Sequence, residues 1–131
     1  MAGPNEQEPD DDGSITDEMT LWRRISPLWW TFDAKLGTHR VTSAAFEDHP
    51  DGSSMSVTIA EEAVGVDVLL DGHEGYGVAS FPARVARHDC GQHLVRRPLP
   101  KNPAHAEVVG RKTDAVKKKL RLASTVLVQP S

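Results

Sequence analysis

Short segments between residues 19 and 109 alternate apolar with polar side chains, which is the period of a half-buried β-strand. The clearest alternation covers residues 64–70, where valine or leucine takes every second position, and we expect residues 76–80 to return beside it as a hairpin. Residues 40–46 predict a short strand or a strand that leads into a helix. Further short strands are predicted at residues 19–25, 55–59, 93–97, 105–109 and 126–128.

A helical period replaces this alternation near the C terminus. Thr113 can cap a helix that runs to about Ala123, with apolar residues on one face and basic residues on or beside the other. Pro82 suits the first turn of another short helix that ends before Gly91. The pattern therefore predicts an α+β fold, a small mostly antiparallel sheet with two or three short helices, including a C-terminal basic amphipathic helix.

Large aromatic side chains are concentrated near the start of the predicted sheet. Trp22, Trp29 and Trp30 lie close together in the sequence, in the company of Leu28 and Phe32. We expect this segment to belong to the hydrophobic core. Because an exposed aromatic cluster marks an interface instead, the three tryptophans are also a candidate contact surface for a partner protein.

Length and composition fit one domain with a real core, since 38% of the 131 residues are hydrophobic. No apolar run approaches the roughly 18–20 residues that a membrane helix needs. The acidic N terminus lacks the apolar region of a secretory signal, and the single cysteine excludes a disulfide framework within the chain. We therefore expect a cytoplasmic protein that does not contact a membrane.

The net charge of −4 conceals a segregation of charge along the chain. Residues 1–18 hold seven of the 19 acidic residues and none of the 15 basic ones, so residues 19–131 carry +3. Residues 84–121 contain eleven bases and three acids. The composition of residues 1–18 is typical of segments that stay disordered. We predict an acidic disordered tail there, followed by a single small α+β domain at residues 19–131.

The C-terminal helix and the residues before it form the first candidate site. A basic helix can lie along phosphate groups, because each contact releases condensed counterions without base-specific geometry. The alternative is a plain solvated helix face. The acidic tail could also fold back and screen this helix. The candidate residues for an anionic partner such as nucleic acid are Arg111, Lys112, Lys117, Lys118, Lys119 and Arg121.

His88, Cys90 and His93 are weak candidates for a metal site. Zinc accepts imidazole and thiolate ligands, and Cys90 and His93 are suitably spaced, but the sequence contains no second ligand pair. The same residues could form a Cys-His nucleophile if an imidazole lowered the pKa of the thiol. We expect neither a metal nor a cofactor, and we interpret these residues as a polar helix end and turn.

Several stretches of the chain resemble a group of short, uncharacterised bacterial proteins, and the similarity extends over most of residues 20–128. The stretches are LWRRI (21–25), RVTSAAF (40–46), MSV (55–57) and NPAHAEVVG (102–110) with Lys112-Thr113. No activity is assigned to this group, so no catalytic residue is carried over from it. The resemblance implies a complete small bacterial protein, an accessory product of a multi-gene operon.

The expected function is that of a small non-catalytic accessory or binding protein, whose partner is nucleic acid or another protein of the same operon. The enzyme alternative looks like an ADP-ribosyltransferase in broad layout only. That likeness implies Arg24 as the residue that holds the dinucleotide, Thr42 with Ser43 beneath the nicotinamide ribose, and Glu107 as the late acid.

Overall fold

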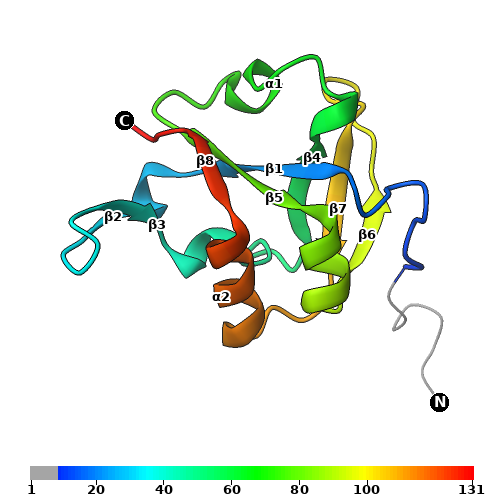
Figure 1. Cartoon of the computed structure of the whole chain (residues 1–131). Helices are drawn as coiled ribbons and strands as arrows, with labels where there is room; N and C mark the ends of the chain where they lie inside the picture. The colour runs from blue at the N-terminus through cyan, green and yellow to red at the C-terminus, as the bar shows by residue number, and fades with distance from the viewer. Residues whose placement is uncertain (1–8) are drawn as a thin grey trace.

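Six antiparallel strands form one sheet, in the order β6-β7-β4-β1-β5-β8, in the computed structural model, which describes residues 9–131 (Figure 1). Two further strands, β2 and β3, pair with each other outside this sheet. This architecture confirms the predicted α+β class. The strands are β1 (Thr20–Ile25), β2 (Trp30–Asp33), β3 (Thr38–Val41), β4 (Met55–Ile59), β5 (Gly77–Pro82), β6 (His93–Arg96), β7 (His105–Val109) and β8 (Thr125–Val128).

Short helices connect the strands, and one longer helix precedes β8. They are α1 (Asp67–Leu70), α2 (Asp114–Ala123), η2 (Pro27–Trp29), η3 (Ser43–Phe46), η4 (Ala60–Glu62) and η5 (Val85–Asp89). The predicted C-terminal helix and its cap are confirmed, since the backbone N–H of Val116 donates to the hydroxyl of Thr113 at 3.2 Å. None of the helices among residues 9–131 has the length and apolar character that crossing a bilayer would require.

The chain between β4 and β5 crosses one face of the sheet and contains α1 (Figure 1). Because β4 and β5 flank β1 on opposite sides, the segment that connects them has to pass over β1. Leu69 is buried there, while Val64 is fully exposed. The predicted strand at residues 64–70 is therefore wrong. A segment that lies over the face of a sheet is outside the plane in which neighbouring strands form hydrogen bonds, so these residues satisfy their backbone groups in one helical turn instead.

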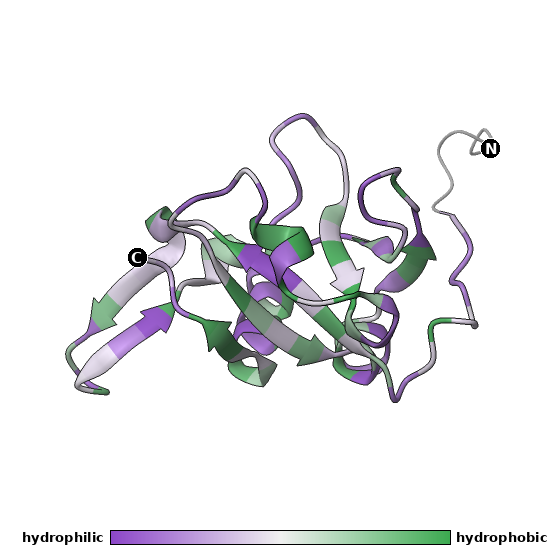
Figure 2. Ribbon diagram, turned by 90° about the horizontal axis from the view of Figure 1, so that it is seen from above, coloured by the Kyte–Doolittle hydropathy of each residue, from purple (hydrophilic) through white to green (hydrophobic). Residues whose placement is uncertain are grey.

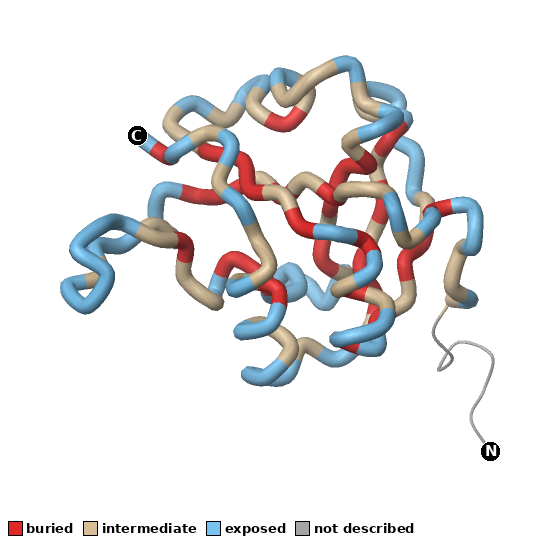
Figure 3. Tube along the Cα trace, in the orientation of Figure 1, coloured by how far each residue is buried: buried red, intermediate tan, exposed pale blue. Residues whose placement is uncertain are grey.

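The core lies on the other face, between the sheet and a layer made of α2, η3 and η5 (Figures 1 and 3). Phe46 of η3 meets Phe81 of β5 edge to face, with 6.0 Å between the ring centroids. Leu120 of α2 belongs to the same cluster and is fully buried. The two faces of the sheet are thus unequal, because the core occupies one, and the short α1 segment and the loop between β6 and β7 cover part of the other.

The β2–β3 hairpin projects from the body of the protein in two perpendicular views (Figures 1 and 2). Trp30 stacks on His39 across the hairpin, with 5.9 Å between the ring centroids. Trp29 and Trp30 are half-buried, but Leu28 is 90% exposed and Phe32 is 57% exposed. The prediction of a buried aromatic segment is therefore wrong for Leu28 and Phe32, since a two-stranded ribbon outside the main sheet offers too little surface to cover them.

Residues 9–18, which we call the N-terminal strap, pack against the domain rather than extending as a tail. Ile15 is fully buried in the core. The backbone N–H of Asp12 donates to the carbonyl of Leu94 in β6 at 2.8 Å. The predicted disorder is therefore wrong for residues 9–18. The burial of Ile15 and specific hydrogen bonds offset the conformational entropy that this segment loses when it becomes ordered, which its average composition did not reveal. Residues 1–8 of the predicted tail lie outside the described residues.

Two arginines hold the acidic side chains of the strap. Arg87 in η5 bonds to Asp11 at 2.9 Å and to Asp17 at 2.8 Å. Arg96 at the end of β6 lies 3.6 Å from Asp12. The clustered acids of the sequence are thus distributed over fixed partners, and much of the positive charge of residues 84–121 is neutralised within the chain.

The strap should loosen in acid. The hydrogen bond from Arg87, followed by that from His88, holds the pKa of Asp17 below its usual value. A carboxyl whose pKa is lower in the folded chain contributes stability above its unfolded pKa, and this contribution is lost as the pH falls through the folded pKa. We expect the free energy of unfolding in urea to fall below about pH 4 and to fall less in Asp17→Asn. Asp10→Asn is the matched control, and identical pH profiles for all three proteins would contradict this role of Asp17.

Candidate ligand-binding pocket

The sheet opens between β1 and β4, and this opening forms the base of the candidate site. The two strands pair only where Leu21 faces Ile59 and Trp22 faces Thr58. Beyond this point β1 continues to pair with β5 as far as Ile25, and β4 continues to pair with β7. Backbone groups that face the opening therefore need hydrogen-bond partners other than a neighbouring strand.

Arg23 closes the opening from the core side with its guanidinium. The guanidinium donates to the carbonyl oxygens of Ala45 at 2.9 Å, Ser56 at 2.8 Å and Glu47 at 3.3 Å. Its central carbon lies 5.6 Å from the centroid of a Trp29 ring. Only 6% of Arg23 is exposed. One buried side chain thus satisfies the open edge of β4 and two carbonyls of the segment that contains η3.

The charge of Arg23 has no carboxylate in direct contact among the residues that the structure describes. Burial, followed by repulsion from Arg24, lowers the pKa of Arg23 to about 10, so the group stays cationic at neutral pH. Burial also lowers the pKa of Arg24, whose guanidinium donates to the carbonyl of Leu69 at 3.1 Å. Two adjacent guanidinium groups at the opening therefore rely on neutral carbonyls for their hydrogen bonds, and the attraction of the more distant Asp48 offsets their positive charge only in part.

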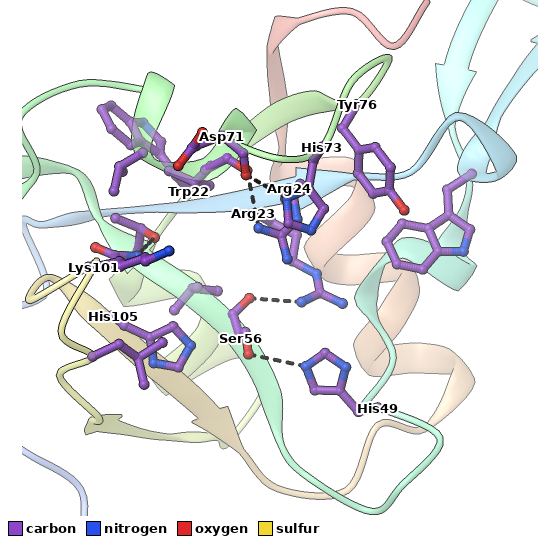
Figure 4. A pocket seen from close by; sticks show the side chains of 17 residues that line it. Trp22, Arg23, Arg24, His49, Ser56, Asp71, His73, Tyr76, Lys101 and His105 are labelled. Atoms are coloured by element: carbon purple, nitrogen blue, oxygen red, sulfur yellow. Dashed lines mark hydrogen bonds between the residues drawn. The ribbon is translucent and has the colours of Figure 1, made fainter.

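A cavity of about 530 Å³ lies over this part of the sheet, with β1 and β4 as its floor (Figure 4). One wall is built by α1 and the residues that follow it, and the other by the loop between β6 and β7. Figure 4 shows Arg23 and Arg24 in the middle of the group, with Lys101 and His105 to one side of them. The lining residues include Trp22, Arg23, Arg24, Trp29, His49, Ser56, Thr58, Asp71, His73, Tyr76, Lys101, Asn102 and His105.

The pocket is cationic, because Asp71 is the single carboxylate in a lining that contains two arginines, one lysine and three histidines. His73 and His105 place Nδ1 at 3.0 Å and 2.8 Å from the carbonyl oxygens of Asp71 and Arg97. A carbonyl oxygen only accepts, so each Nδ1 carries a proton and Nε2 is left as the second functional atom of the ring. Lys101 is exposed and has no ion pair in the described part of the chain.

The aromatic rings of the pocket differ in how far their faces are occupied. Trp29 faces Arg23, and the guanidinium carbon of Arg24 lies 6.0 Å from the centroid of the Tyr76 ring. Tyr76 also meets His73 edge to face at 5.1 Å. Trp22 lines the same cavity and is half-buried, and no ring or cation of residues 9–131 stacks on it. An aromatic platform therefore lies beside uncompensated positive charge.

The predicted basic helix has much of its charge paired. The ammonium group of Lys112 is buried and bonds to Asp48 at 3.0 Å. Lys117 bonds to Glu47 at 2.9 Å, and this hydrogen bond raises the pKa of Lys117. Lys119 donates to the backbone carbonyl of Asp89 at 3.1 Å. Of the six predicted residues, Arg111 and Lys118 are exposed and their side chains form no ion pair within residues 9–131, and Arg121 is half-buried.

Residues 9–18 do not screen α2 in the way predicted for the acidic tail. Their acids bond to Arg87 and Arg96, which belong to η5 and β6 and not to α2. The opposite charges of the two ends correctly predicted ion pairs between the acidic segment and basic residues, but not which basic residues. Ile15 is anchored in the same core cluster as Ala86 of η5, so the acids of the strap meet Arg87 and not α2.

The three candidate metal ligands, His88, Cys90 and His93, lie in different environments. His88 bonds to Asp17 at 2.8 Å, and His93 bonds to the carbonyl of Pro9 at 2.8 Å. The thiol of Cys90 is buried, which raises its pKa, so the idea of a thiol activated by a neighbouring imidazole is wrong. Residues 9–131 contain no group of three or more histidine, cysteine or acidic residues with the geometry to hold a metal ion.

The residues of the ADP-ribosyltransferase alternative are not gathered at one site. Arg24 lines the pocket, but Thr42, Ser43 and Glu107 are not among the lining residues. Glu107 forms an ion pair with Arg97 at 3.5 Å. Trp22 and Trp29 line the pocket and Trp30 does not, so the three tryptophans of the predicted interface are divided between two surfaces.

Sequence reasoning missed the pocket, although one signal for it was present. Leu21, Arg23 and Ile25 occupy alternate positions of a strand, so an arginine shares the face of two core residues. A charge at such a position needs buried partners and marks an irregularity in the sheet. The contribution of Lys101 and His105 could not be found in this way, because it depends on how the loop before β7 folds over the sheet.

No protein-family model, curated protein or solved structure matches this chain. The site therefore rests on its own geometry.

Replacement of Arg23 tests its part in holding the opening. Arg23→Leu removes the donors of three carbonyls, and we expect the free energy of unfolding to fall by about 3 kcal/mol, since buried unsatisfied groups cost about 1–3 kcal/mol each and water from the pocket restores part of the loss. Arg24→Leu is the matched control and should cost about 1 kcal/mol, because only one carbonyl loses its donor. Equal losses in urea denaturation of the two variants would contradict the bridging role of Arg23.

Proposed function

We propose that this chain is a non-catalytic binding protein whose pocket between α1 and the β6–β7 loop takes an anionic ligand. The observation that carries the proposal is the lining itself, in which Arg23, Arg24 and Lys101 have no carboxylate partner in the described part of the chain. Five other arginines of the described residues bond to carboxylates, as Arg40 does to Asp33 at 2.7 Å, whereas Arg111 and Arg121 have no ion pair there. Three of the cations without a carboxylate partner thus meet at one concave surface.

Electrostatics favour an anion here more than on a flat surface. Charges in a concave site with low-dielectric walls focus their field, and hydrogen bonds between ionised partners are roughly twice as strong as neutral ones. Arg23 is fixed by three hydrogen bonds and Arg24 by one, so little side-chain entropy is lost when a ligand binds near them. These features support binding of a small anion, and no catalytic step follows from them.

The pocket is a stronger candidate than the basic helix. Lys112 and Lys117 on and before α2 already bond to Asp48 and Glu47, so an anionic partner at α2 would have to displace these carboxylates. The charges that α2 leaves exposed, Arg111 and Lys118, would support nucleic-acid contact of the kind that depends on phosphate alone. Both surfaces can be tested together.

Inorganic pyrophosphate is a suitable probe, titrated into the full-length protein and followed by calorimetry. We expect Lys101→Gln to weaken binding about fivefold, the effect of removing roughly 1 kcal/mol of charge interaction, and Lys118→Gln to leave it unchanged. Both lysines are exposed, so neither substitution should affect folding. Weakening by Lys118→Gln alone would move the site to α2, and the absence of any binding would overturn the proposal.

A second candidate is a protein–protein adaptor, supported by the projecting hairpin. Leu28 is 90% exposed, Leu36 is 64% exposed and Phe32 is 57% exposed, close to the half-buried Trp29 and Trp30. Large exposed apolar residues next to aromatic ones are typical of protein interfaces.

Affinity purification from the native host with nuclease present would test the adaptor. We expect a partner of another protein species to be recovered with the wild type and to be lost with the double variant Leu36→Ser, Phe32→Ser. The double variant Val64→Ser, Leu122→Ser, which changes exposed apolar residues elsewhere, is the control. Equal recovery with both double variants would count against the hairpin as the interface.

A further inference from the structure

We infer that the ligand of the pocket is a nucleoside phosphate, held by its phosphate at the cations and by its base on Trp22. This inference rests on the proposed anion-binding function and adds a chemical class to it. Three properties of the lining support it: uncompensated positive charge, one aromatic face without a partner, and a small set of neutral and acidic hydrogen-bonding groups beside them.

The cations supply the phosphate end. Arg24 uses one of its five N–H donors on Leu69, and Lys101 has no ion pair among residues 9–131. Nδ1 of His105 is committed to the carbonyl of Arg97, which fixes the plane of the ring and leaves Nε2 as its remaining polar atom. In Figure 4, Lys101 and His105 lie on the same side of Arg24. A phosphate between them would add negative charge to a lining in which Asp71 is the single carboxylate.

Trp22 supplies the platform for a base. Every nucleobase has a flat π-face, and stacking on an aromatic side chain is a sequence-tolerant source of affinity. Trp29 already faces Arg23, and Tyr76 contacts both Arg24 and His73, so these two rings are occupied on at least one side. Trp22 is the ring of the lining without such a partner in the described part of the chain, and it neighbours Arg24 on the same face of β1.

The remaining polar groups suit a sugar and a base better than a simple polyanion. Asp71 lies in the cationic lining, where its carboxylate would repel a phosphate but accept hydrogen bonds from ribose hydroxyls or from an exocyclic amine. Asn102 donates to the hydroxyl of Thr58 at 2.9 Å, which orients its amide and leaves the amide oxygen as an acceptor. The volume of about 530 Å³ lies within the range of small-ligand sites, about 300–1,000 Å³.

Calorimetric titration of the full-length protein with four probes tests the inference. The probes are AMP, adenosine, ribose 5-phosphate and inorganic pyrophosphate, which separate the base, the sugar and the phosphate. We expect AMP to bind at least tenfold more tightly than either adenosine or ribose 5-phosphate, because only AMP engages both Trp22 and the cations. We also expect AMP to quench tryptophan fluorescence.

Two pairs of variants assign the two ends of the ligand. Trp22→Leu keeps an apolar side chain and should weaken AMP about tenfold while leaving pyrophosphate unchanged, whereas Trp30→Leu, in the hairpin, should change neither. Lys101→Gln should weaken both ligands, and Lys35→Gln, an exposed lysine in the hairpin turn, should weaken neither. Retained fluorescence quenching in Trp30→Leu and its loss in Trp22→Leu would identify the ring.

Each contrary result has a distinct meaning. Ribose 5-phosphate or pyrophosphate binding as tightly as AMP would overturn the nucleotide inference and leave the anion-binding proposal standing. The absence of binding by all four probes would overturn both. A single-stranded oligoribonucleotide that binds more than tenfold tighter than AMP, with a dependence on Arg111 and Lys118, would replace the mononucleotide with a polymer and the pocket with α2.

Discussion

The bridge that Arg23 makes across the opening of the sheet is the interaction on which the arrangement of this protein depends. A sheet can separate two strands only if the exposed backbone groups find other partners, and here one guanidinium serves carbonyls of Ser56, Ala45 and Glu47. The same contact ties β1 and β4 to the segment containing η3, and so links the sheet to the layer that covers its core. Without the Arg23 guanidinium, an open sheet would leave the carbonyls of Ser56, Ala45 and Glu47 without this donor. If β1 and β4 instead paired along their whole length, the concave surface between them would be lost.

The charges of the molecule fall into two populations with different roles. In one population, arginine and lysine side chains are bound to carboxylates, as Arg87 is to Asp11 and Asp17, and these pairs fasten the strap and α2 to the domain. In the other, Arg23 and Arg24 are held by neutral carbonyls and keep their charge available to the cavity. The net charge of the chain describes neither population, because it averages over both.

Much of the fold could be predicted from local pattern, and the site could not. The alternation at 55–59 and 105–109 and the cap at Thr113 predicted β4, β7 and α2, because each of these elements is specified by its own residues. The segment 64–70 has an equally good alternation but contains α1, since it crosses the face of the sheet and lies outside the plane in which strands pair. Acidic composition likewise predicted disorder for residues that Ile15 anchors in the core.

The pocket is the feature that local sequence pattern predicts least. Its floor comes from two strands distant in the sequence and its walls from a crossover and a proline-containing loop, so no single stretch carries its pattern. Only the arginine in the core-facing register of β1 gave a local sign of it. The prediction of an anionic partner followed from the number of basic residues near the C terminus. In the folded chain several of these, such as Lys112 and Lys117, are already bound to carboxylates and are not available to a ligand.

The strap also makes the two edges of the sheet unequal, and this limits how copies of the protein can associate. Residues 9–18 occupy the outer edge of β6 through the Asp12 and Leu94 backbone contact, whereas no strand of residues 9–131 lies beyond β8. Pairing of identical molecules through β8 would leave the edge of β6 that the strap covers at each outer end of the joined main sheet, so it would stop at two copies related by a twofold axis. A main sheet open at both sides could add copies without limit, and the strap covers one of these two sides.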